Sequence, residues 1–375
     1  MELLNKAKRV GIMGGAFDPI HYGHLTAAEC VRCEMGLDIV LFIPTGRPPH
    51  KDTITFSEHR YLMTVLATAD NPYFHTSRME LDRPGPSYTI DTLLMLKDMT
   101  DAELFFIVGA DEMLQISTWK DADALPDLCR WVPVTRPGYS IKEALEIPGL
   151  DISGTALRRR INTGKPIKYL ITPDVEKYIR DSDLYQNHNV CDIEIHKAVA
   201  GQLSERRYRH TLGVIETAIL LAARHGVNLR KAYLAALLHD YAKEFKEDEK
   251  RALCKKFAIP LDPIQDQYVN LVHGQLGAEF ARRSFNIDDP DILEAIIYHT
   301  TGRAGMGPLE QIIKIADNIE PNRPDYPELE IIRNLSMVDL SSAAAASIKK
   351  DIRYTESKGH IIHPWGKEAL EDLER

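Results

Sequence analysis

A glycine- and histidine-rich stretch, Gly14–Leu25, constrains the fold of this chain more than any other part of its sequence. It follows a short apolar run, Val10–Met13, that predicts a buried strand, and it leads into a helical pattern. Two glycines at its start let the backbone approach a ligand closely. His21 and His24 are three positions apart, so both project from one face of the predicted helix start, where unpaired amides favour anions. The stretch therefore predicts a phosphate-binding site at a strand-to-helix turn.

Strand-like and helical patterns alternate through the first half of the chain. The predicted strands are Val10–Met13, Ile39–Ile43, Leu104–Val108 and Trp131–Thr135, and the predicted helices include Thr26–Met35, Ser57–Ala69 and Thr89–Met99. This alternation is typical of an α/β fold, a doubly wound parallel sheet with helices on both faces. Ligands of such folds bind beyond the carboxyl ends of the strands, which is where the histidine stretch lies.

The second half loses the strand signals. Around residues 181–192 the pattern breaks into Asp, Ser, Asn and His, and a domain boundary placed there gives domains 1–188 and 189–375. Beyond the boundary, apolar residues recur at helical spacing, as in Ile292–Tyr298 and Leu309–Ile319. This periodicity predicts an all-α second domain.

Composition excludes several classes of function. The 375 residues carry a formal net charge of −9, which argues against a nucleic-acid partner. No apolar run approaches the ~20 residues that span a bilayer, and the first residues lack a signal-peptide pattern, so we expect no membrane association and a cytoplasmic location. Cys30 and Cys33 have no second cysteine pair to complete a zinc site, so we expect free thiols.

The first half resembles the nucleotidylyltransferase superfamily, which has a Rossmann-like fold and the signature Gly-x-Phe-Asp-Pro-x-His-x-Gly-His. The resemblance implies in-line displacement at the α-phosphate of ATP, with Mg²⁺ accompanying the nucleotide. It implies that His21 and His24 contact the phosphates and stabilise developing charge. It also implies that the nucleotide pocket is lined by Gly14, Gly15 and Phe17.

Two further motifs resemble the same superfamily and extend the expected ATP site. A segment similar to the signature Ile-Ser-x-Thr-x-Ile-Arg supplies Ser153 and Thr155 as expected helix caps, with Arg158 facing the phosphates as a catalytic residue. Gly109 and Asp111, at the end of the third predicted strand, resemble the nucleotide-binding Gly-x-Asp of the superfamily.

Within the superfamily, the first half resembles the bacterial nicotinate-mononucleotide adenylyltransferases over roughly residues 8–186. The resemblance rests on a Pro-Pro-His-Lys segment, a Ser-Tyr-Thr segment and a tryptophan. It implies that Thr89 and Trp119 bind the nicotinate ring, by stacking and by hydrogen bonds to its carboxylate, and that His50 and Lys51 lie near the substrate phosphate. Nicotinamide mononucleotide and pantetheine phosphate stay open as alternative acceptors.

A set of histidines and aspartates in the second half resembles the HD phosphohydrolase superfamily. Members of that superfamily hold a divalent metal with a His, a His-Asp pair and a distant Asp, and the matching residues here are His210, His239, Asp240 and Asp317. His273 and His299 are expected to hold a second metal with Asp240 as the bridging ligand. Imidazole and carboxylate suit iron, manganese or zinc, and the resemblance favours iron, with one or two ions left open.

The second half is most similar to the bacterial HD-domain family that hydrolyses diadenosine tetraphosphate symmetrically to ADP. Arg206 and Arg207 before the first ligand support this resemblance, and Lys243 is expected to hold an oxygen of a dinucleoside polyphosphate during catalysis. A metal-binding nucleotide sensor without turnover, or a phosphatase for mononucleotides or a nucleotide alarmone, are the alternatives. A homo-oligomer is left open. Three further histidines of this half are expected at the surface: His225, His360 and His363.

Overall fold

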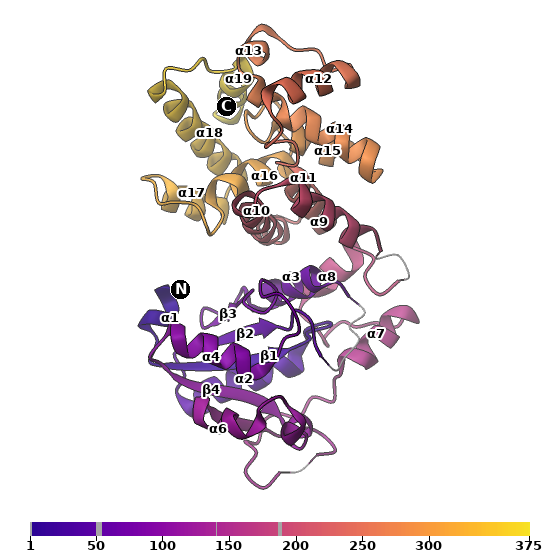
Figure 1. Ribbon diagram of the computed structural model, residues 1–375, viewed down its shortest axis with the longest axis vertical. Helices are drawn as coiled ribbons and strands as arrows, with labels where there is room; N and C mark the ends of the chain where they lie inside the picture. Colours follow the sequence, from indigo (N-terminus) through magenta and orange to yellow (C-terminus); the bar gives the residue numbers. More distant parts are fainter. Residues whose placement is uncertain (1, 50–54, 140, 187–189) are drawn as a thin grey trace. The chain divides into compact units, whose positions relative to one another are not determined.

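The computed structural model describes residues 2–49, 55–139, 141–186 and 190–375 (Figure 1). The chain forms two compact units, Met1–Asn189 and Val190–Arg375. The boundary predicted from the sequence, at residue 188, lies outside the described residues. Across those described ranges, no helix is both long and apolar enough to cross a membrane.

A five-stranded parallel sheet forms the centre of the first unit. Its strands are β1 (Arg9–Gly15), β2 (Ile39–Pro44), β3 (Phe74–Thr76), β4 (Glu103–Gly109) and β5 (Arg130–Val134), and they lie in the order β3-β2-β1-β4-β5. The predicted parallel α/β sheet is therefore confirmed, and each predicted strand corresponds to an observed one. The strand β3 was not predicted, because three residues are too few to show a period.

Helices flank this sheet and bury one of its apolar faces. Side chains from β1, β2 and β4 share a core with α4 (Thr89–Met99) and α6 (Leu125–Leu128). The other helices of the unit are α1 (Glu2–Lys6), α2 (Tyr22–Met35), α3 (Ser57–Thr68), α5 (Ala110–Met113), α7 (Gly154–Asn162) and α8 (Pro173–Asp181). Both α2 and α3 contact the sheet, and α8 packs against α3.

The strand order creates a crevice between two neighbouring strands. β1 pairs with β2 on one side and with β4 on the other, so the chain connections diverge from β1 in opposite directions. A point of this kind leaves space beyond the carboxyl ends of the two central strands, which is where doubly wound folds bind nucleotides. In this unit the space lies beyond Gly15 and Gly109.

The second unit contains helices, joined by loops, and no strand among its described residues. Its helices are α9 (Val190–Gln202), α10 (Glu205–Arg224), α11 (Leu229–Leu238), α12 (Glu247–Phe257), α13 (Pro263–Gln267), α14 (His273–Phe285), α15 (Pro290–Tyr298), α16 (Pro308–Ile319), α17 (Leu329–Ser336), α18 (Leu340–Ser357) and α19 (Pro364–Leu373). The helices α10, α11, α15 and α16 pack on one another, and each carries or ends next to a histidine or aspartate discussed below. The predicted all-α domain is confirmed.

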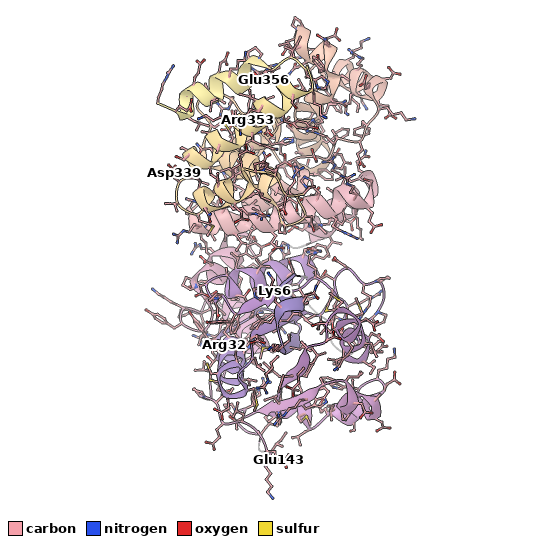
Figure 2. The ribbon with its side chains drawn as sticks, turned by 90° about the vertical axis from the view of Figure 1, so that its left-hand side faces the viewer. Lys6, Arg32, Glu143, Asp339, Arg353 and Glu356 are labelled. Atoms are coloured by element: carbon pink, nitrogen blue, oxygen red, sulfur yellow. The ribbon has the colours of Figure 1, made fainter. Side chains whose placement is uncertain are left out.

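Local sequence explains where several of these helices begin. The side chains of Ser204, Asn228 and Asp289 accept hydrogen bonds from main-chain amides in the first turns of α10, α11 and α15. Such caps satisfy amides that have no partner within the helix. Charged side chains such as Arg353 and Glu356 on α18 are exposed and lie on the outside of this unit (Figure 2).

Candidate functional site

A cleft of about 680 Å³ opens in the first unit beyond the carboxyl ends of β1 and β4. The residues that line this cleft include every residue predicted for ATP binding and adenylyl transfer in this unit: Gly14, Gly15, Phe17, His21, His24, Gly109, Asp111, Ser153, Thr155 and Arg158. These residues are separated by more than a hundred positions in the sequence. The strand order brings the residues at and after the ends of β1 and β4 to one edge of the sheet, and the start of α7 adds the remaining three, Ser153, Thr155 and Arg158.

The two histidines of the cleft are fixed against each other at the start of α2. His21 is the N-cap residue, and its backbone N–H donates a hydrogen bond to Nδ1 of His24 at 3.3 Å. The two rings stack with their centroids 3.8 Å apart, and the Phe17 ring meets His24 edge-on at 5.1 Å. Because Nδ1 of His24 accepts a hydrogen bond, a neutral His24 ring carries its proton on Nε2, where it is a donor.

Electrostatics keep His21 neutral. The residue is buried, and burial together with the positive charge of Arg136 lowers its pKa to about 4. Arg136 also lines the cleft and forms an ion pair with Asp111. Arg136 was not among the predicted residues, although its position just after β5 places it at the same sheet edge.

The start of α7 joins the histidine stretch through a main-chain contact. Nη1 of Arg158 donates to the carbonyl oxygen of Asp18 at 2.6 Å. A Cβ at Gly154 would lie 2.8 Å from that same carbonyl oxygen, so only glycine allows this close approach. Ser153 caps α7 as predicted, but the prediction of Thr155 as a second cap is wrong. Thr155 lies inside the first helical turn, and its hydroxyl accepts a hydrogen bond from Arg158 at 3.2 Å.

A buried arginine supports the loop after β1, which lines the cleft. Arg60 on α3 is 1% exposed, and its guanidinium donates to the carbonyl oxygens of Ala16 at 2.7 Å and Thr45 at 2.7 Å. It thereby ties the loop after β1 to the loop after β2. Its role was missed because an arginine within an amphipathic helix carries no signal of which main-chain atoms it meets.

A tyrosine near the end of the first unit holds the aspartate of the histidine stretch. The hydroxyl of Tyr185 donates to Oδ1 of Asp18 at 2.7 Å, and both side chains are buried. Burial and the neighbouring carboxylate raise the pKa of Tyr185 well above its ordinary value, so the hydroxyl keeps its proton and stays a donor.

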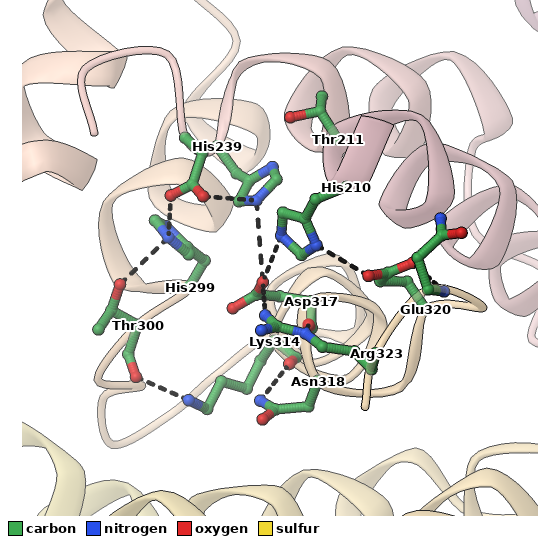
Figure 3. Close-up of polar contacts among 12 residues, drawn as sticks. His210, Thr211, His239, His299, Thr300, Lys314, Asp317, Asn318, Glu320 and Arg323 are labelled. Carbon is green, nitrogen blue, oxygen red and sulfur yellow. Dashed lines mark hydrogen bonds and ion pairs between the residues drawn. The ribbon is translucent and has the colours of Figure 1, made fainter. Parts of the chain in front are cut away.

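In the second unit, the predicted metal ligands converge from separate helices, and Figure 3 shows four of them pointing toward one another. They come from five places: His210 from α10, His239 and Asp240 from the end of α11, His273 from the start of α14, His299 from the end of α15 and Asp317 from α16. All four of these histidines and Asp240 are buried.

The ligand atoms of these residues form two groups that share His239. His210, His239 and Asp317 offer ligand atoms that lie within 4.8 Å of one another, and so do His239, Asp240 and His299. The closest approach in the first group is 3.0 Å, between Nε2 of His210 and Oδ1 of Asp317.

Asp240 lies between the histidines with its two oxygens facing different rings. Its Oδ2 is 3.6 Å from Nε2 of His239, whereas its Oδ1 is 3.2 Å from Nε2 of His273 and 3.5 Å from Nε2 of His299. A carboxylate in this position has one oxygen for each side of the centre. This geometry fits the bridging role implied by the resemblance.

Each histidine of the centre directs Nε2 inward because its other nitrogen is already engaged. His239, His273 and His299 lie at helix ends, and Nδ1 of each ring donates to the carbonyl three residues earlier, at 2.6–2.7 Å: Ala236, Asn270 and Ile296. Nδ1 of His210 instead donates to the carboxylate of Glu320 at 3.0 Å. Such partners fix the tautomer and the ring orientation of metal-binding histidines.

Electrostatics prepare three groups of the centre, His239, His273 and Asp240, for a cation. Burial lowers the pKa of His239 to about 4 and, with the charge of Lys243, that of His273 to about 3. For Asp240 burial acts in the opposite direction, but His239 and Lys243 outweigh it and hold the carboxyl pKa well below its ordinary value. Metal ligands must be deprotonated, and these groups are deprotonated at neutral pH.

Three ligand atoms of the centre are also left without a hydrogen-bond partner within the described residues. They are Nε2 of His210, Nε2 of His239 and Oδ1 of Asp240, and all three are buried. A buried polar atom without a partner is costly, and bound cations would satisfy these atoms. The donor set therefore fits a divalent metal of the imidazole- and carboxylate-binding class.

Half-buried cationic side chains contact the carboxylates of this centre. Nη1 of Arg207 lies 2.8 Å from Oδ2 of Asp240, and Nζ of Lys243 lies 3.9 Å from its Oδ1. Nη2 of Arg323 lies 2.6 Å from Oδ1 of Asp317. Arg323 was not predicted, because nothing in the sequence sets it apart from other surface arginines near a helix end.

Comparison with known proteins identifies the first unit. The cytidylyltransferase-like family matches residues 12–160. A probable nicotinate-nucleotide adenylyltransferase from Moorella thermoacetica is 47% identical over 207 residues, which make up 50% of this chain and 95% of that protein. Another from Leifsonia xyli is 49% identical over 198 residues, or 50% of this chain and 99% of that protein.

The chain belongs to the nicotinate-nucleotide adenylyltransferase family.

These adenylyltransferase relatives leave half of the chain unmatched, and the HD domain family matches residues 207–322 of it. A solved structure described as a predicted HD superfamily hydrolase involved in NAD metabolism, from Clostridium acetobutylicum, is 35% identical with a TM-score of 0.47, covering 49% of this chain and 96% of that chain. A Plasmodium falciparum nicotinic acid mononucleotide adenylyltransferase in complex with NaAD is 21% identical with a TM-score of 0.43, covering 48% and 97%.

Of the four residues expected to bind the nicotinate nucleotide, the two that the structure describes do not line the cleft. Thr89 is the first residue of α4, and the half-buried Trp119 packs against Phe106 and Trp131. Neither lines the cleft beyond β1 and β4. His50 and Lys51 lie outside the described residues. The assignment of all four to the nicotinate nucleotide stays a prediction.

The histidines expected at the surface of the HD domain differ in their surroundings. His360 is exposed, as predicted. The prediction is wrong for His363, which is 7% exposed. Its Nδ1 caps α19 by accepting from the N–H of Trp365, and its Nε2 donates to the carboxylate of Asp262 at 2.8 Å. His225 is only half-buried, and its Nε2 lies 2.6 Å from the carbonyl oxygen of Ser336.

Proposed function

We propose that the first unit transfers the adenylyl group of ATP to nicotinate mononucleotide. A phosphate oxygen of nicotinate mononucleotide attacks the α-phosphorus of ATP, the bond from that phosphorus to the β-phosphate oxygen breaks, and pyrophosphate leaves. The products are deamido-NAD and pyrophosphate. The observation that carries this proposal is the stacked pair His21–His24 in the cleft beyond β1 and β4, in a chain whose relatives are named for this activity.

Each group in the cleft has a part in this reaction. Nε2–H of His24 and the guanidinium of Arg158 are donors for oxygens that gain negative charge as pyrophosphate leaves. The glycines at the end of β1 let the phosphates approach the main chain closely, and the start of α2 provides amides for them. Mg²⁺ bound to ATP would neutralise charge on the triphosphate. Positioning and charge stabilisation suffice, so no protein nucleophile is required.

The acceptor is tested by giving the full-length protein Mg-ATP and one of three acceptors. These are nicotinate mononucleotide, nicotinamide mononucleotide and pantetheine phosphate, and mass spectrometry identifies the adenylylated product. We expect deamido-NAD to form at least about 10-fold faster than either alternative product, because a site that hydrogen-bonds a carboxylate discriminates against an analogue lacking it. Faster turnover of another acceptor would overturn the assignment.

We propose that the second unit is a metal-dependent hydrolase that splits diadenosine tetraphosphate into two ADP molecules. Water adds across the central phosphoanhydride, its hydroxyl joins one phosphorus, and the released phosphate oxygen takes up the proton. The convergence of imidazole and carboxylate groups around buried Asp240 carries this proposal. The ligands would be His210, His239, Asp240, His273, His299 and Asp317, with iron preferred and one or two ions held.

The chain's own residues would bind and orient the polyphosphate. A divalent metal at this centre supplies a water of lowered pKa and charge for the phosphate. Lys243 and Arg207 lie within 4 Å of Asp240, so their charges face the place where phosphate oxygens would approach. Cations in that position favour a ligand with several adjacent phosphates over one with a single phosphate.

A substrate panel separates this activity from its alternatives. The full-length protein, loaded with Fe²⁺ without oxygen or with Mn²⁺, is given diadenosine tetraphosphate, ADP, AMP and a guanosine tetraphosphate alarmone. We expect ADP as the product of the first substrate and slower release of phosphate from the others. Metal binding without any product would instead identify a sensor, and preferential release of phosphate from AMP would identify a mononucleotide phosphatase.

Two further expectations from the sequence stay proposals. We place the boundary between the two activities near residue 188, consistent with the compact units Met1–Asn189 and Val190–Arg375. The cytoplasmic location stays a prediction that rests on the sequence patterns alone.

A further inference from the structure

One histidine of the metal centre is held in a different way from the other three. His239, His273 and His299 lie at helix ends, where main-chain carbonyls lack helical partners and accept the Nδ1–H of the ring. His210 lies well inside α10, where the carbonyls of the preceding turn are already used by the helix. A side chain from another element must therefore accept its Nδ1–H.

Glu320 at the end of α16 is that acceptor. It is 1% exposed, and its Oε1 accepts the hydrogen bond from Nδ1 of His210 at 3.0 Å (Figure 3). Its Oε2 accepts a second bond from the backbone N–H of Asn322 at 2.6 Å, so both oxygens are fixed. Asp317, one helical turn earlier on the same helix, meets Nε2 of His210. The imidazole thus lies between two carboxylates.

The opposite helix leaves room for this carboxylate. Gly213 follows His210 by three positions, so both lie on the face of α10 that packs on α16. A Cβ at Gly213 would come closer than 3.0 Å to Oε2 of Glu320. Glycine is a poor helix former, so its presence in the middle of α10 agrees with a requirement for space rather than for helix stability.

We propose that Glu320 is a positioning residue that strengthens metal binding at the His210–His239–Asp317 half of the centre. A carboxylate on Nδ1 makes the imidazole a stronger donor at Nε2, fixes the ring and adds a negative charge behind it. The half formed by His239, Asp240 and His299 has only main-chain acceptors behind its histidines. The two halves therefore differ in affinity for the same ion. This inference rests on the proposed metal centre.

Calorimetric titration of the full-length, metal-free protein with Mn²⁺ tests the inference. The wild type is compared with Glu320→Gln, which keeps the shape but removes the charge. We expect the tighter binding step to weaken by about 10- to 100-fold and the weaker step to change less than about threefold. Glu310→Gln is the matched control, since Glu310 is a buried carboxylate on the same helix whose partners are Arg303 and Gly307. Its affinities should equal those of the wild type.

Gly213→Ala reaches the same contact from the other helix. The new methyl group displaces the carboxylate of Glu320 from His210, so we expect the tighter step to weaken by about 10-fold. In a Glu320→Ala background there is no carboxylate to displace, and Gly213→Ala should then change Mn²⁺ affinity by less than about twofold. This dependence on Glu320 separates the proposed role from a general disturbance of α10.

The outcomes distinguish this inference from the proposed function. A wild type that binds no Mn²⁺ contradicts the metal centre itself. A wild type that binds Mn²⁺ while Glu320→Gln binds it equally well overturns the inference and leaves the centre standing. A Glu320→Gln variant that loses both steps and also melts at a lower temperature without metal gives Glu320 a structural role, which overturns the inference as well.

Discussion

The two candidate sites handle phosphate with different parts of the polypeptide. In the first unit, glycines at strand ends, a helix start and a stacked histidine pair surround a cleft of about 680 Å³. In the second, imidazoles and carboxylates from five helices meet around Asp240, which is 2% exposed. Near the first site, the buried charges of Arg60 and Asp18 are held by hydrogen bonds from within the chain. The second site gathers several ionisable groups at one buried point, and a centre of that kind is stable only when a cation or another partner balances it.

Removal of metal should separate the two sites most widely. After treatment with a strong chelator and desalting, we expect hydrolysis of diadenosine tetraphosphate to fall by about 1,000-fold or more, because water without a metal has a far higher pKa. Adenylyl transfer, measured on the same sample after Mg²⁺ is added, should return fully. The contrast between the sites would be lost if Mg²⁺ restored both reactions equally.

Substitution of His24 should produce the opposite loss. In His24→Ala, the Nε2–H donor of the cleft is gone, and we expect adenylyl transfer to fall by about 10²- to 10³-fold. The hydrolysis rate should stay within about twofold of the wild type. His360→Ala, which removes an exposed histidine, is the control for both assays. Unchanged adenylyl transfer in His24→Ala would remove the histidine pair from the mechanism.

Substitution of Arg60 should sharpen the contrast, because the first site depends on the position of the main chain in the loops that Arg60 holds. In Arg60→Lys, one ammonium replaces the guanidinium that joins the carbonyls of Ala16 and Thr45. We expect kcat/KM for adenylyl transfer to fall by about 10-fold and the first unit to lose about 2 kcal/mol of stability. Urea denaturation and initial rates measure both, and wild-type values in both would exclude the supporting role of Arg60.

Lower pH should have the smallest of these effects, a loss of stability in the first unit through the protonation of His21. Burial, helped by Arg136, lowers the pKa of His21 from 6.5 to about 4, so the unfolded chain binds a proton on this residue before the folded chain does. His21 therefore makes stability fall as the pH drops from about 6.5 to about 4, by at most about 1.4 kcal/mol per pH unit. Denaturation of wild type and His21→Gln across this range should show the smaller slope in the variant. Equal slopes would mean that His21 is accessible to protons in the folded state.

The sequence predicted the features whose residues lie close together along the chain. The histidine stretch and the strands that end at Gly15 and Gly109 are contiguous signals, so the sheet and part of the lining of the cleft followed from them, although Arg136 did not. The helical period and the His-Asp pair similarly indicated the helical domain. These features depend on residues that are close together in the sequence, so they can be predicted without a structure.

The supporting residues could not be predicted because their partners are distant in the sequence. Arg60 meets main-chain carbonyls of two other loops, and Glu320 meets His210 across 110 positions. Thr155 was expected as a cap because its type suits one, but Ser153 already fills that position. His363 was expected at the surface, and only the packed structure places it at the buried start of α19.

The central claim is that the chain holds two chemically independent sites, and Asp240→Asn tests it most directly. Asparagine keeps the size of Asp240 but removes the charge that faces His239 on one side and His273 and His299 on the other. Both reactions and the bound metal are measured on one full-length sample. We predict that hydrolysis and bound metal are lost while adenylyl transfer stays within about twofold of the wild type. An equal fall in both reactions, with the protein still folded, would contradict the account.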